Sequence, residues 1–156
     1  MTDTLKSICE QCVHLLSPRL DFIPAESQRQ RDIILRDLRE LISAASNNNE
    51  RTVVLLAGCL FESVLYCFIQ SQSDYIAARR GSFTFDPDQS LSNYVAFFNR
   101  WFLNVFSIPD LVVDARDLVH INQELQNALD VCSRAAPEMI RLLDAFLGEL
   151  AKYAQA

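Results

Sequence analysis

Hydrophobic positions along the chain fall into long runs, and the longest run spans residues 53–69. Within it only Glu62 carries a charge, and no proline interrupts it. The run is several residues too long for an ordinary strand, and Asn47, Asn48 and Asn49 just before it are residues that cap helix N-termini. We therefore expect a central helix that is buried on every side. Glu62 would then lie inside the core, where an ionised carboxylate needs a partner or a proton.

Shorter segments on both sides repeat hydrophobic residues every three or four positions, the pattern of amphipathic helices. The predicted helices span residues 4–16, 25–45, 91–106, 111–122 and a last segment that begins near 126 or 135 and ends near 153. A break near Pro137 would decide between the two starts of the last helix. Half of the residues are hydrophobic, with only 3 Gly and 5 Pro. The sequence therefore predicts an all-α chain, a single domain over residues 1–156, folded as an antiparallel bundle of five to six helices.

The net charge and the N-terminal sequence indicate which partners and which location to expect for this bundle. The net charge of −6 counts against DNA and against broad binding of nucleic acids, which needs a basic face. The arginines of residues 25–45 alternate with acids, so a solvated face is favoured over a nucleic-acid surface. The polar N-terminus lacks the features of a signal segment, and Glu62 interrupts a run that is marginal for spanning a bilayer. We expect a cytoplasmic protein with no membrane contact.

The five cysteines are odd in number, which favours buried free thiols over a set of disulfides. Cys9 and Cys12 have the two-residue spacing of a metal or redox pair, but no second Cys pair or His-rich partner follows them. We expect no metal and no cofactor.

Aromatic residues gather in the segment 91–106, at Tyr94, Phe97, Phe98 and Trp101. Such side chains form a core or a partner-binding surface in most helical proteins. Stacking on RNA bases would use the same rings, although only Arg100 accompanies them. A pocket for a small ligand would use them as well, so this third interpretation stays open.

Arg116 and His120 stand four residues apart and would share one face of a helix. A histidine is suited to proton transfer near neutral pH, and a neighbouring arginine can hold a phosphate. The structural alternative is a histidine bound to a backbone carbonyl, with Arg116 paired to Glu62.

Three segments taken together resemble the HEPN superfamily of small helical bundles. They are Ala57-Gly58-x-x-x-Glu62-x-x-Leu65, the aromatic segment 91–106, and Ala115-Arg116-Asp117-Leu118-Val119-His120. The resemblance covers roughly residues 51–153. It implies a homodimer in which Arg and His of both subunits share a cleft, and catalytic members cleave RNA there without a metal. By position, Arg116 would contact the scissile phosphate, His120 would act as general acid or base, and Glu62 would orient Arg116.

Two departures from the family pattern bear on activity. Asp117 stands where many members carry Asn, and the interval between Arg116 and His120 is shorter than in the nuclease members. An acid beside the cleft repels phosphate. We therefore favour a non-catalytic module for dimerisation or for binding a protein partner, in a toxin–antitoxin or host-defence setting. The alternative is a metal-independent endoribonuclease that uses Arg116, His120 and Glu62.

Overall fold

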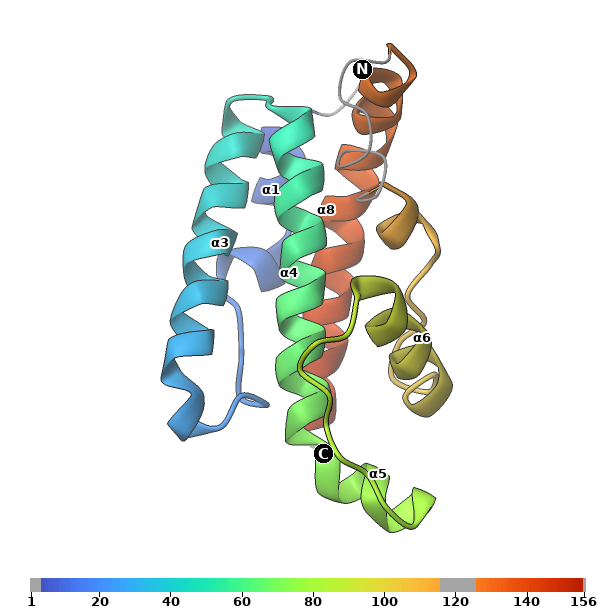
Figure 1. Ribbon diagram of the computed structural model, residues 1–156. Coiled ribbons are helices and arrows are strands. Elements are labelled where there is room, and N and C mark those ends of the chain that lie inside the picture. Colours follow the sequence, from blue (N-terminus) through green and yellow to red (C-terminus); the bar gives the residue numbers. More distant parts are fainter. Residues whose placement is uncertain (1–3, 116–125, 156) are drawn as a thin grey trace.

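A computed structural model describes residues 4–115 and 126–155, and every regular element in these ranges is helical (Figure 1). The elements are α1 (Leu5–Glu10), α2 (Val13–Leu16), a 3₁₀ turn η1 (Ala25–Ser27), α3 (Gln28–Ser46), α4 (Glu50–Ser71), α5 (Ser73–Arg80), α6 (Leu91–Trp101) and α8 (Gln126–Gln155). A further helical segment begins at residue 111. The predicted all-α class is confirmed. The described ranges hold more helices than the five or six expected, because residues 4–16 form two helices and the separate helix α5 follows α4.

The predicted central helix is confirmed as α4, which packs against α3, α6 and α8 (Figure 1). Asn49 caps it, because its side-chain oxygen accepts a hydrogen bond from the Thr52 amide at 3.3 Å. By length and composition α4 would be able to cross a membrane, yet 61% of its most apolar stretch is buried within the bundle. The Phe61 ring stacks on Phe146 of α8, with 5.3 Å between ring centroids. The Phe68 ring lies edge-on to Phe98 of α6 at 5.7 Å, so one core joins the three helices.

The two long neighbours of α4 run in opposite directions. Only residues 47–49 separate α3 from α4, and the Asn49 amide donates to the Ala44 carbonyl at 2.9 Å, which makes these helices an antiparallel pair. In contrast, α8 runs parallel to α4 (Figure 1). Near their C-terminal ends the Tyr153 hydroxyl donates to the Gln72 side chain at 3.0 Å. The expected antiparallel order is therefore not confirmed for α4 and α8, which need the long connection through α5 and α6 to run side by side.

The prediction of a single helix over residues 4–16 is wrong, because the helix is interrupted between Glu10 and Val13. The cause is a carboxylate from the other end of the sequence. One oxygen of Asp144 in α8 accepts hydrogen bonds from the backbone amides of His14 at 2.8 Å and Leu15 at 3.1 Å. These are the first-turn amides of α2, and the residue before that turn supplies no side-chain cap. The Asp144 carboxylate of α8 thus caps the N-terminus of α2.

Other helix ends also differ from the local pattern. The central helix extends a little beyond the apolar run to Ser71, and the separate helix α5 follows it. The aromatic helix ends at Trp101 instead of residue 106. There the Asn99 side chain donates to the Ile108 carbonyl at 2.9 Å and accepts from the Ile108 amide at 2.8 Å, which closes residues 99–108 into a loop. The last helix starts at Gln126 and continues through Pro137 without a break.

Candidate functional site

Glu62 is half-buried, so the expectation that α4 is buried on every side is wrong for one face. The half-buried positions of α4 recur at helical spacing and include Leu55, Cys59, Glu62 and Tyr66. This face lies between α3 and the segment that leads into α6, neither of which covers it fully. Glu62 therefore stands at the edge of the core, where water can solvate part of its carboxylate.

A groove of about 340 Å³ runs along this face. Its lining comes from α3, α4, the segment before α6 and α6 itself, and includes Gln30, Ile33, Ile34, Cys59, Glu62, Ser63, Tyr66, Pro87, Gln89 and Tyr94. Among the described residues, the lining holds no histidine and no basic side chain. Arg116, Asp117 and His120 lie outside the described residues, so their pairing with Glu62 stays a prediction.

One arginine of α3 departs from the solvated face expected for this helix. Arg31 donates to the Ile23 carbonyl at 2.6 Å and so holds the segment before α3. Arg36 agrees with the expectation, because its side chain is 59% exposed and its guanidinium pairs with the Asp37 carboxylate at 2.9 Å.

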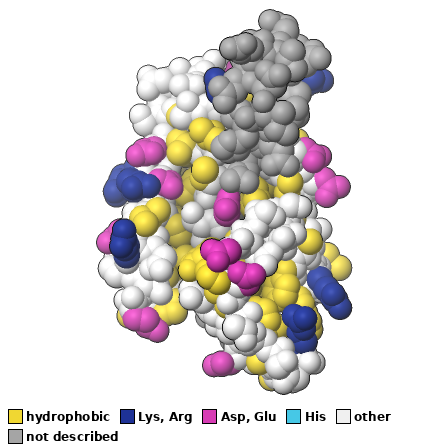
Figure 2. Space-filling model, viewed as in Figure 1, with side chains coloured by type: hydrophobic (Ala, Val, Ile, Leu, Met, Phe, Trp, Pro, Cys, Tyr) yellow, Lys and Arg dark blue, Asp and Glu magenta, His cyan; other side chains and the backbone are white. Residues whose placement is uncertain are grey.

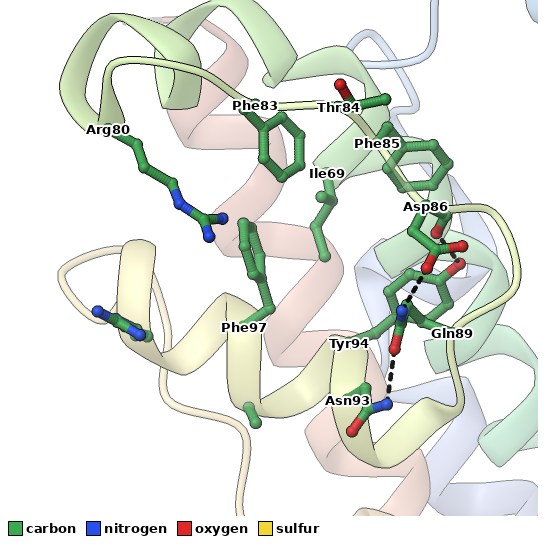
Figure 3. A pocket seen from close by; sticks show the side chains of 12 residues that line it. Ile69, Arg80, Phe83, Thr84, Phe85, Asp86, Gln89, Asn93, Tyr94 and Phe97 are labelled. Atoms are coloured by element: carbon green, nitrogen blue, oxygen red, sulfur yellow. Dashed lines mark hydrogen bonds between the residues drawn. The ribbon is translucent and has the colours of Figure 1, made fainter.

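A second cavity, of about 430 Å³, lies between α6 and the loop 81–90; we call it the aromatic pocket (Figure 3). Its wall contains the rings of Phe83 and Phe97, whose centroids are 5.4 Å apart. Of the four aromatic residues singled out in the sequence, Tyr94 and Phe97 line this pocket. Phe98 is fully buried in the core, and Trp101 lies beside Phe97 at 6.2 Å. The rings therefore divide between core and cavity.

The two ends of the aromatic pocket differ in charge. Arg80 and Arg100 line one end, and neither forms a salt bridge within the part of the chain that the structure describes. At the other end Gln89 donates to Asp86 and accepts from the Asn93 side chain at 2.6 Å (Figure 3). Hydrogen bonds from the Asp88 amide and from Gln89 lower the pKa of Asp86, which keeps its carboxylate charged. The pocket is thus cationic at one end and anionic at the other.

Comparison with known proteins finds no match. Neither the protein-family models, nor the curated proteins, nor the solved structures contain one. The resemblance to the HEPN superfamily therefore stays a prediction that depends on the quoted residues alone.

Sequence reasoning missed Phe83, Arg80 and the pocket role of Arg100. The one available signal was Gly81, which marked the end of α5 and the start of a long loop. Residues on α5, on the loop and on α6 meet only in the folded chain, so no local spacing predicts their contact.

The Cys9 and Cys12 thiols are both buried in the core. Burial, together with the nearby charge of Asp144, raises the pKa of each thiol to about 11. Metal binding and redox chemistry use the thiolate and favour a lowered pKa. The described residues also contain no group of three or more His, Cys, Asp or Glu side chains placed to hold a metal. Burial and the raised pKa of both thiols suit a role of Cys9 and Cys12 in the packing of the core.

Proposed function

We propose that the chain is a HEPN-like, non-catalytic interaction module that works as a homodimer. The observation that carries the proposal is a hydrophobic surface at the C-terminal end of α6, formed by Phe97, Trp101 and Leu103, which we call the α6 surface. Leu103 is 62% exposed, and the two rings are half-buried. Figure 2 shows hydrophobic side chains at the surface over the region of α5 and α6, with Lys or Arg side chains beside them.

This composition is typical of protein interfaces. Exposed hydrophobic groups mark interaction sites when they are clustered, and Trp, Phe and Arg are enriched where partners meet. Arg100 adjoins the α6 surface and would supply a polar rim. In a two-fold dimer the same surface packs against its copy. The net charge of −6 on each copy opposes association at long range, so the hydrophobic contact must supply the affinity.

The charge of the Glu62 groove favours a role without catalysis. Its described lining holds one carboxylate and no cationic side chain that would attract a phosphate. The acid at Asp117, where many family members carry Asn, would also repel a phosphate. The proposed setting remains a toxin–antitoxin or host-defence pair, in which the partner would be a protein.

Sedimentation velocity at micromolar concentration tests the proposal. We expect the wild-type chain to sediment as a dimer whose interface buries more than about 1,000 Å². Leu103→Lys places a charge in the α6 surface and should weaken dimerisation at least about tenfold, the change that about 1.4 kcal/mol produces. Val13→Lys is the matched control, because Val13 is 67% exposed but lies on α2. A wild-type monomer, or equal dimerisation of both variants, would contradict the proposal.

A further inference from the structure

We propose that the aromatic pocket binds a small aromatic monocarboxylate, with the ring against Phe83 and Phe97 and the carboxylate between Arg80 and Arg100. This inference goes beyond the interaction module, although the pocket shares Phe97 and Arg100 with the α6 surface and its rim. Four features of the pocket support it: a loop that is held in place, an aromatic wall, two cations without a salt bridge to a described residue, and an acid at the far end.

The loop that forms the pocket is held in place before any ligand arrives. Gly81 has φ = 93°, a conformation that favours glycine and lets the chain turn back from α5. The Tyr94 hydroxyl then donates to the Asp86 carbonyl at 3.1 Å, which ties the loop to α6. The Phe85 ring lies edge-on to Tyr66 of α4 at 4.9 Å, which ties the loop to the core. A preformed cavity avoids the ordering cost that a mobile loop would add to binding.

The wall of the pocket suits a planar ring. Phe83 and Phe97 are inclined by 30° to each other, and Ile69 lies beside them (Figure 3). A volume of about 430 Å³ falls in the range of small-molecule sites. Aromatic ligands gain both hydrophobic burial and ring contacts in such a place.

The cationic end specifies the charged group of the ligand. A guanidinium donates two parallel hydrogen bonds to a carboxylate, and both Arg80 and Arg100 are exposed and without a salt bridge to a described residue. The adjacent Arg79 differs, because its guanidinium lies over the Tyr75 ring at 3.7 Å. Figure 3 shows the Arg80 side chain directed toward Phe97.

The anionic end then excludes a second negative charge. Asp86 is a pocket-lining carboxylate that accepts hydrogen bonds from the Asp88 amide and Gln89. It repels another acid at that end and so favours a ligand with one carboxylate, oriented toward the two arginines.

Isothermal titration of the full chain with 2-naphthoate tests the inference, and 2-naphthamide provides the neutral match. We expect 2-naphthoate to bind at least about tenfold more tightly than the amide. The double variant Arg80→Gln/Arg100→Gln should lose this preference, whereas Arg79→Gln should keep it. Phe83→Leu should weaken both compounds, because it removes a ring from the wall. Thermal unfolding of each variant verifies that it is folded.

Three results would overturn the inference: no binding of 2-naphthoate at millimolar concentration, equal binding of acid and amide, or an unchanged preference in the double variant. Leu103→Lys separates this site from the dimer, because Leu103 does not line the pocket. As a monomer this variant leaves Phe97 and Arg100 uncovered, so it should bind 2-naphthoate at least as tightly as the wild type.

Discussion

At the scale of single residues, burial decides what the cysteines do. Cys67 of α4 is only 4% exposed, and burial raises the pKa of its thiol to about 11 from the usual 9.0. Desolvation alone accounts for this rise, since no charged neighbour contributes. A thiol that stays protonated packs like a small hydrophobic side chain, which explains how cysteines fit within the central helix.

This raised pKa predicts a loss of stability at high pH. Between about pH 9 and about pH 11 the unfolded thiol gives up its proton while the folded thiol keeps it, so the free energy of unfolding falls as pH rises. Each such thiol contributes at most about 1.4 kcal/mol per pH unit. We expect Cys67→Ala to lose less stability than the wild type between about pH 8 and about pH 10 in urea unfolding with a reductant present. Equal losses in the two proteins would contradict the assignment.

At the scale of elements, the sequence predicted helices with strong local signals. The long apolar run and its asparagine cap located α4, and the hydrophobic repeat located α3, because both signals lie within the helix or directly beside it. It failed where a helix end depends on a hydrogen bond to a residue outside that helix, as with Asp144 for α2 and with the bonds from Asn99 of α6 to Ile108. The sequence also did not predict that Glu62 is half-buried, because its exposure depends on which neighbouring helices cover α4.

The same limit applied to the aromatic pocket. The aromatic segment predicted four residues that could line a cavity, Tyr94, Phe97, Phe98 and Trp101, and two of them, Tyr94 and Phe97, do so. Arg80 was not predicted, because it comes from α5 and reaches the pocket only through the turn at Gly81.

The cap on α2 gives a prediction at this scale. Asp144→Ala removes the acceptor for the His14 and Leu15 amides and should lower the free energy of unfolding by about 1 kcal/mol, the usual cost of losing a helix cap. Glu149→Ala is the control on the same helix, because the Glu149 pair with Lys152 is exposed and should contribute about 0.5 kcal/mol or less. Urea unfolding of the three proteins measures the difference. Equal stability of the two variants would show that the cap contributes little.

At the scale of the whole molecule, incubation with RNA separates the proposed module from the nuclease alternative. We expect the purified protein to leave single-stranded RNA intact over hours in EDTA, because the module has no catalytic role. Cleavage that yields a 2′,3′-cyclic phosphate and spares DNA would contradict this expectation. A fall in that cleavage by roughly 10²–10⁴ in His120→Ala would then identify His120 as a general acid or base.

The hydrogen bonds from α2 to Asp144 also constrain the order of folding. They join residues 130 and 129 positions apart, whereas the α3–α4 pair closes across residues 47–49. Short connections close quickly, and distant pairings form late because a long loop must first be ordered. During synthesis α3 and α4 can therefore pair while most of α8 has not yet been made. Although α1 and α2 are translated before α3 and α4, α2 receives its cap only after the chain has been made as far as Asp144 in α8.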